Sequence, residues 1–133
     1  MPFVLDASVS ACWAFDDEDH PTAALALERL RTDEAHAPTL WWYEMRNIVV
    51  INERRGRLTR EDATAFLRSL VELGISDHHA PDEQTVLFTA RTQGLTVYDA
   101  SYLALAQQLA LPLATLDAQL MRAAQAVQVP LFQ

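Results

Sequence analysis

The sequence predicts an α/β fold in which a short parallel sheet is flanked by helices. Two observations lead to this class. Short apolar runs alternate along the chain with longer segments in which apolar residues recur at helical spacing. Each of the three glycines follows one of these longer segments, as a left-handed residue that ends a helix does. Strands that alternate with helices imply a parallel sheet, and the crossovers between its strands are expected to be right-handed.

The clearest strands are Phe3–Leu5 and residues 113–116, whose continuous apolar side chains are typical of buried parallel strands. Weaker strand patterns lie at residues 35–37, 75–78 and 127–131. The short lengths of all five segments favour a small sheet.

Helices are predicted at residues 22–31, 39–55, 59–73, 81–93 and 118–126. Thr59 and Asp62 open the third of these segments with the spacing of a capping box. Pro81 begins the fourth, where proline is favoured in a first helical turn. The glycines that follow the second, third and fourth segments are Gly56, Gly74 and Gly94.

Length and composition predict a single domain over residues 1–133. Half of the residues are hydrophobic and 21% are charged, which is sufficient for a core and atypical of disorder. No apolar run approaches the roughly 20 residues of a membrane span, and the first residues lack the basic segment of a signal peptide. The single cysteine, Cys12, excludes an intrachain disulfide and a cysteine-rich zinc site. We therefore expect a cytoplasmic protein with no membrane partner.

The charge balance excludes several kinds of chemistry. The formal net charge is −8, and all ten basic residues are arginines. Without lysine the chain cannot form a Schiff base or a P-loop, and its scattered glycines provide no phosphate-binding loop. The acidity also disfavours nucleic-acid binding through a broad basic surface. A phosphate-bearing substrate would have to be met by local arginines or by metal ions.

Two acidic residues directly follow predicted strands. Asp6 comes after Phe3–Leu5, and Asp117 comes after residues 113–116. If these strands are parallel neighbours, both carboxylates lie at the same edge of the sheet, where such folds bind ligands. Aspartate is also favoured at the residue that caps a helix N-terminus, so capping is the alternative role for both.

Two further acids lie on predicted helices beside apolar residues. Asp99 shares a helix face with Tyr102 and with several small apolar side chains; its alternative role is to stabilise the first helical turn. Glu44 lies in the middle of residues 39–55, where capping cannot explain it. The alternative for Glu44 is a buried ion pair with Arg46 or another arginine, because acids are rarely buried without a partner.

Four carboxylates gathered in one cleft would repel one another. Two unit charges 4 Å apart cost about 4 kcal/mol at an effective dielectric constant of about 20. A hard divalent cation removes this cost, and ligation by oxygen alone suits Mg²⁺ or Mn²⁺. Asp6, Glu44, Asp99 and Asp117 are therefore a candidate metal site, provided that the fold brings them together.

The same motifs resemble the PIN-domain family, specifically the VapC-type toxins of bacterial toxin–antitoxin pairs. The matching segments span nearly the whole chain and lie at residues 4–8, 44–47, 98–106 and 115–117. Each segment is short, so the resemblance rests on their order, their spacing and the total length.

This resemblance implies a three-layer α/β/α fold and a metal-dependent endoribonuclease toxin that a cognate antitoxin inhibits. The residues that it implies as catalytic groups and as ligands of one or two Mg²⁺ or Mn²⁺ ions are Asp6, Glu44, Asp99 and Asp117. Our hypothesis is that the three aspartates bind most of the metal, while Glu44 completes a second site or positions the attacking water. The residues implied as supports of these acids are Ser8, Asn47 and Thr115.

Arginines and tryptophans give weaker signals. Arg46, Arg54 and Arg55 are candidate RNA contacts, and their alternative role is to form a solvated helix end. Trp41 and Trp42 could stack on bases, but packing in a core or in a dimer contact is favoured. Because these residues begin a segment that is apolar on more than one face, we expect a homodimer.

Other function classes fit the sequence less well. A receiver domain requires a lysine, and a phosphoaspartate phosphatase would have a second aspartate where Ser8 stands, so both are disfavoured. The remaining alternative is a non-catalytic interaction module of the same fold, with an acidic surface for a protein partner. Stabilisation by Mg²⁺ or Mn²⁺ would separate the two, because a ligand of the folded state raises the melting temperature.

Overall fold

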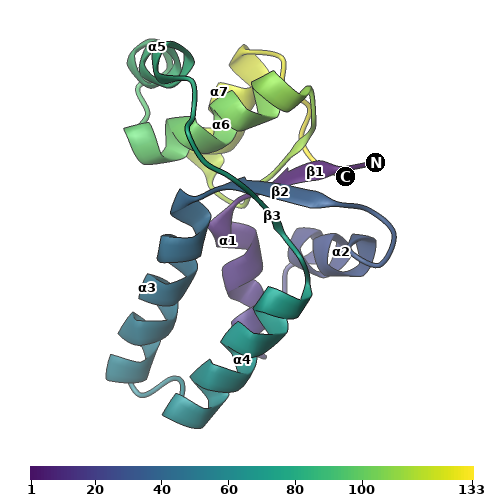
Figure 1. The fold of residues 1–133 in the computed structure, drawn as a ribbon, viewed down its shortest axis with the longest axis vertical. Coiled ribbons are helices and arrows are strands. Elements are labelled where there is room, and N and C mark those ends of the chain that lie inside the picture. The colour runs from purple at the N-terminus through teal and green to yellow at the C-terminus, as the bar shows by residue number, and fades with distance from the viewer.

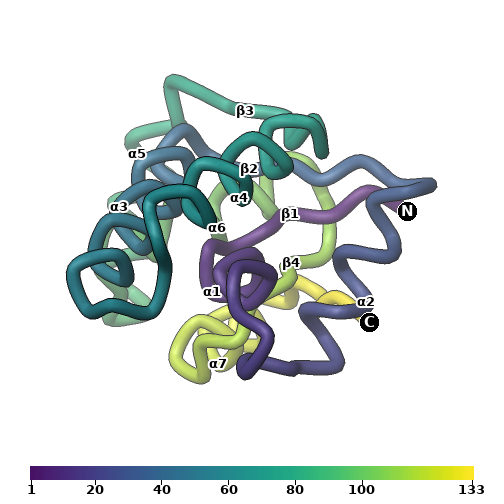
Figure 2. Tube along the Cα trace, turned by 90° about the horizontal axis from the view of Figure 1, so that it is seen from below, coloured from purple at the N-terminus to yellow at the C-terminus, as the bar shows by residue number.

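A four-stranded parallel sheet forms the middle layer of the protein, as Figure 1 shows for a computed structural model that describes residues 1–133. Its strands are β1 (Phe3–Leu5), β2 (Ala35–Pro38), β3 (Ser76–His78) and β4 (Leu113–Ala114). They are ordered β3-β2-β1-β4, and every pairing is parallel. Figure 2 accordingly shows β1 between β2 and β4. The two strands that precede Asp6 and Asp117 are therefore neighbours.

Helices cover both faces of this sheet. They are α1 (Ala7–Ser10), the 3₁₀ helix η1 (Ala11–Ala14), α2 (Pro21–Arg29), α3 (Leu40–Arg54), α4 (Arg60–Glu72), α5 (Glu83–Gln93), α6 (Val97–Leu109) and α7 (Ala118–Ala126). Figure 1 shows α5, α6 and α7 on one side of the sheet, with α1, α3 and α4 on the other. The predicted α/β class, its parallel sheet and the three-layer arrangement are confirmed.

Local sequence signals fix several helix ends. Gly94 ends α5 in the left-handed conformation, with φ of 65°. The capping box of α4 is present: the Thr59 hydroxyl accepts from the Asp62 N–H, and the Asp62 carboxylate accepts from the Thr59 N–H. The helix predicted over residues 81–93 begins two residues later, at Glu83, because the Asp82 side chain provides the cap by accepting from the Thr85 N–H.

The C-terminal strand prediction is wrong. Residues 127–131 form no strand, and only Leu131 makes an isolated parallel bridge, to Leu113. Gln128 is left-handed, with φ of 61°, and Pro130 has no N–H to donate, so this segment cannot sustain a ladder. The strand predicted over residues 113–116 ends at Ala114, and the side chain of the next residue, Thr115, bonds to Asp6.

The core lies between the sheet and its covering helices. Phe3, Val4 and Leu5 are fully buried, as expected for a central parallel strand. Helix α6 packs on β1, β2 and β4, and six of its 13 residues are buried. No helix of the structure combines the length and the apolarity needed to cross a membrane.

Candidate functional site

The four predicted carboxylates lie around the carboxyl ends of the strands. Asp6 directly follows β1, and Asp117 follows β4 by three residues. Glu44 lies in the second turn of α3, which begins just beyond β2. Asp99 lies in the first turn of α6, which runs back over the sheet toward β4. The charges of the four acids influence one another, which marks them as one electrostatic cluster.

Asp6 is at the centre of this cluster, and its carboxylate does not act as a helix cap. The residue stands at the N-cap position of α1, yet its side chain makes no capping hydrogen bond, so the capping alternative is wrong. Instead Oδ2 accepts from the hydroxyls of Ser8, at 2.6 Å, and Thr115, at 2.7 Å. Only 6% of Asp6 is exposed. Both hydroxyls reach the same oxygen, which leaves Oδ1 without a side-chain donor.

The two hydroxyls also tie the loop after β1 to the loop after β4. Ser8 Oγ accepts from the Leu116 N–H at 2.9 Å, and Thr115 Oγ1 accepts from the Asp117 N–H at 3.1 Å. A buried carboxylate without donors would be costly, and the Ser8 and Thr115 hydroxyls reduce that cost for Asp6. The network fixes the relative positions of Asp6 and Asp117.

The other two aspartates combine a place in the cluster with a structural role. Asp117 caps α7, since its Oδ1 accepts from the Leu120 N–H at 2.9 Å. Asp99 is not the cap of α6: Thr96 holds that position and accepts from the Asp99 N–H at 3.1 Å. Both carboxyl groups are half-buried. For Asp117, capping and a place in the cluster are therefore compatible roles.

Glu44 is held by a tyrosine rather than by an arginine. Its Oε1 accepts from the Tyr102 hydroxyl at 2.5 Å, a contact that joins α3 to α6. Glu44 makes no ion pair, and the Arg46 guanidinium stacks over the Trp42 ring at 4.2 Å, so the predicted alternative of an ion pair is wrong. Tyr102 was not predicted as a site residue, although its place one turn after Asp99 was the available signal.

Burial and mutual repulsion shift the ionisation of the cluster. Burial raises the pKa of Asp6 above its usual value, against the lowering effect of the Ser8 and Thr115 hydroxyls. Burial also raises the pKa of Glu44. The Tyr102 hydrogen bond lowers this pKa, whereas the negative charges of Asp6 and Asp99 raise it. The pKa of Asp99 is raised by burial and then by Asp117 and Asp6. No arginine forms an ion pair with any of them to offset this cost.

The donor set fits a hard divalent cation in its chemistry. It consists of oxygen atoms only, and it concentrates negative charge that no side chain neutralises. The arrangement is open: no three histidine, cysteine or acidic side chains stand close enough to enclose one ion as they are. The residues that would hold such an ion are Asp6, Glu44, Asp99 and Asp117.

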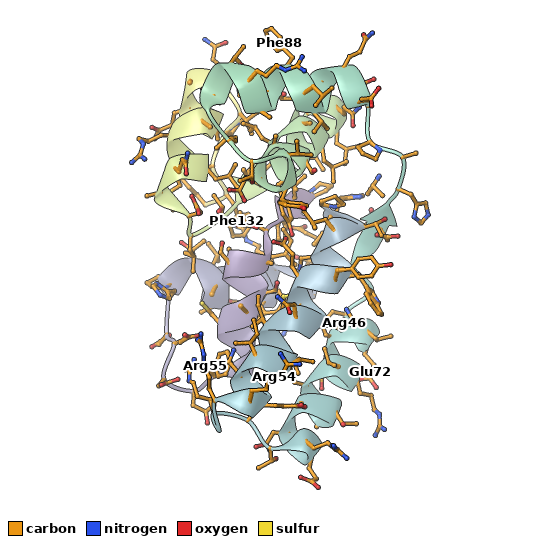
Figure 3. The ribbon with its side chains drawn as sticks, turned by 90° about the vertical axis from the view of Figure 1, so that its left-hand side faces the viewer. Arg46, Arg54, Arg55, Glu72, Phe88 and Phe132 are labelled. Atoms are coloured by element: carbon orange, nitrogen blue, oxygen red, sulfur yellow. The ribbon has the colours of Figure 1, made fainter.

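The remaining predicted residues differ in whether they contact the cluster. Asn47 is exposed on α3 and makes no hydrogen bond, whereas Ser8 and Thr115 contact Asp6 directly. Arg54 and Arg55 are exposed at the far end of α3, as Figure 3 shows. Arg54 comes ten residues after Glu44 on the helix, a rise of about 15 Å.

The two tryptophans of α3 have different environments. Trp41 is buried in the core, and its indole N–H donates to Ser10 Oγ at 2.9 Å. Trp42 is 48% exposed, and Tyr43 beside it is more exposed still. The exposed apolar surface that the sequence predicts on this helix is therefore formed by Trp42 and Tyr43, whereas Trp41 belongs to the core.

Comparison with known proteins gives consistent matches. The profile of the PIN domain matches residues 3–126. The chain is 34% identical over 123 residues to Ribonuclease VapC3 of Pyrobaculum aerophilum, which covers 90% of this chain and 92% of that protein. The crystal structure of PAE2754 from Pyrobaculum aerophilum is similar with a TM-score of 0.74 and 26% identity, over 92% of this chain and 79% of that one.

Two further solved structures share the fold at lower identity. FitAcB from Neisseria gonorrhoeae has a TM-score of 0.70 and 20% identity, over 100% of this chain and 97% of that one. VapBC2 from Rickettsia felis, bound to a DNA fragment from their promoter, has a TM-score of 0.66 and 10% identity, over 100% and 98%. At these identities the likeness is one of fold alone.

Proposed function

The chain belongs to the PIN-domain family, and from this premise we propose that its single domain is a ribonuclease of the VapC kind that depends on Mg²⁺ or Mn²⁺. The observation that supports this most is the cluster of four acids without a counter-charge. Four repelling carboxylates are costly for a fold that has no use for a cation. The 34% identity to a protein named Ribonuclease VapC3 also supports this activity.

The proposed chemistry is hydrolysis of an RNA phosphodiester bond. Asp6, Asp99 and Asp117 would provide most of the metal ligands. Glu44 would complete a second metal site or position the attacking water. The metal, when bound, supplies charge neutralisation on the phosphoryl oxygens and an activated water. The hydroxyls of Ser8 and Thr115 donate to Asp6 and orient it at the centre of the cluster. We expect products with 5′-phosphate and 3′-hydroxyl ends.

The proposed partners follow from the charge of the site. A cognate antitoxin would present an arginine or lysine to the carboxylates, in place of metal. Arg46, Arg54 and Arg55 are the proposed contacts for the RNA backbone, since the chain has no lysine. We propose a homodimer, supported by the exposed side chains of Trp42 and Phe88. The expected location is the cytoplasm, where the Cys12 thiol stays reduced.

The test is RNA cleavage by the purified chain in Mg²⁺, in Mn²⁺ and in EDTA. We expect cleavage only with metal, and a loss of at least about 10- to 100-fold in Asp99→Asn, because even the groups that orient a metal ligand have an effect of that size. Asp19→Asn is the matched control, since Asp19 is exposed and outside the cluster. Cleavage that persists in EDTA or in Asp99→Asn would refute the proposed metal site.

The alternative is a non-catalytic interaction module with the same fold. Its acids would serve as caps and hydrogen-bond acceptors, as Asp117 does for α7. Such a module would cleave none of the RNAs tried and would gain no stability from Mg²⁺ or Mn²⁺. These two negative results together would favour the module over the ribonuclease.

A further inference from the structure

Tyr102 is a core residue whose one polar group is its hydroxyl. The residue is fully buried on α6, one turn after Asp99. Its hydroxyl crosses to α3 and donates to Glu44 Oε1 at 2.5 Å. A buried hydroxyl without a partner would be costly, and a phenylalanine would avoid that cost. Glu44 is therefore the partner that accounts for the hydroxyl.

The same contact restricts Glu44. Its carboxylate has no other hydrogen-bond partner and no ion pair, so the Tyr102 hydroxyl is the one group that fixes its rotation. A glutamate has three rotatable side-chain bonds, and an unrestrained one would have to be ordered each time a ligand bound. Oε1 accepts this hydrogen bond, whereas Oε2 takes part in none.

We propose that Tyr102 is a positioning residue: its hydroxyl fixes Oε1 of Glu44 and so orients the Glu44 carboxylate for metal binding. This inference rests on the proposed function, because it assumes that the four carboxylates bind a divalent ion. Helix α6 then contributes twice: Asp99 as a ligand, and Tyr102 as the clamp on the ligand from α3. Groups that orient a metal ligand in this way affect metal affinity by about 10- to 100-fold.

The experiment measures Mn²⁺ binding by the full chain, from the electron paramagnetic resonance signal of free Mn²⁺. Tyr102→Phe keeps the ring in the core and removes only the hydroxyl, and we expect about 10- to 100-fold weaker binding. Tyr98→Phe is the matched control, because the Tyr98 hydroxyl is on the surface of the same helix and makes no hydrogen bond. Thermal unfolding without metal verifies that both variants are folded.

A double-mutant cycle separates positioning from a general structural effect. If Tyr102 acts through Glu44, then Glu44→Ala/Tyr102→Phe binds Mn²⁺ as Glu44→Ala alone does. An equal loss from Tyr102→Phe in both backgrounds would overturn the proposal, as would unchanged binding by Tyr102→Phe when the wild type binds. Absence of Mn²⁺ binding by the wild type would overturn the proposed function and this inference together.

Discussion

At the scale of single residues, the negative charge of Asp6 opposes folding because the side chain is buried. Burial raises its pKa, so a neutral carboxyl favours the folded state more than an ionised one does. A carboxyl of this kind contributes stability below its unperturbed pKa of 3.8, and loses that contribution as the pH rises through the raised value. Each unit of pKa corresponds to about 1.4 kcal/mol.

Asp6→Asn is therefore expected to stabilise the metal-free protein, by an amount that grows from pH 4 to pH 7. The amide is neutral at both values, whereas the wild-type carboxylate becomes charged in the core. Urea unfolding at the two pH values measures the difference, in buffer with EDTA. Asp19→Asn, on an exposed residue, should show no such growth. A gain of equal size at both pH values would contradict the assignment of this cost to ionisation.

The sequence allowed most of the carboxylate cluster to be predicted, but not its contacts. The acids could be found because each stands after a strand or on an apolar helix face. Tyr102 and Asn47 show the limit, since both lie one turn from a predicted acid. Tyr102 contacts Glu44 and Asn47 is exposed. Which of two such residues turns inward depends on how α3 and α6 pack against each other, and spacing along one helix does not contain that information.

At the scale of elements, a histidine pair joins the two strands at one side of the sheet. His36 Nδ1 on β2 lies 2.9 Å from His78 Nε2 on β3. In a neutral pair one ring donates and the other accepts, whereas two protonated rings would both donate and repel. Burial and the neighbouring His78 lower the pKa of His36, against a small raising effect of Glu34.

We expect the β2–β3 pairing to weaken in mild acid. Because the pKa of His36 is lowered in the folded state, its contribution to stability is complete above the unperturbed value of 6.5 and is lost as the pH falls toward the lowered value. His36→Gln should flatten the fall in unfolding free energy between pH 7.5 and pH 5.5, because the substituted side chain does not titrate. His20→Gln, at an exposed position, should leave the wild-type slope unchanged.

Elements were predictable where local chemistry decides them. The glycine that ends α5 and the capping box of α4 are sequence signals that the fold uses as expected. The failed strand at residues 127–131 and the histidine pair have the opposite cause. His36 and His78 are 42 residues apart, and only the parallel pairing of β2 with β3 brings them together. Leu131 likewise reaches the sheet for one bridge, which apolar character alone cannot distinguish from a strand.

At the scale of the whole molecule, repulsion among the acids makes the metal-free protein less stable than its core would allow. A ligand present at 100 times its dissociation constant stabilises the folded state by about 2.7 kcal/mol. For a chain of 133 residues this corresponds to a rise in melting temperature of roughly 10 °C. We expect Mn²⁺ to produce a rise of that order, measured by differential scanning fluorimetry.

Two controls isolate binding at the cluster from general screening of the net charge of −8. Sodium chloride at matched ionic strength should raise the melting temperature far less than Mn²⁺ does, because it screens charge without binding a site. Asp6→Asn/Asp99→Asn, which removes two charges from the cluster, should lose most of the Mn²⁺ effect. An equal rise with sodium chloride would attribute the stabilisation to screening alone.

The two ends of the chain meet at the edge of the sheet opposite the carboxylates. The Phe3 and Phe132 ring centroids are 4.5 Å apart, and the Phe132 N–H donates to the Leu113 carbonyl at 2.9 Å. Figure 1 shows both termini side by side next to β1. A purification handle or a surface anchor on either terminus would therefore leave the carboxylates facing free solution. A short peptide joining the termini would close the backbone into a ring, which could be reopened at an exposed loop to give a circular permutant with the same carboxylate cluster.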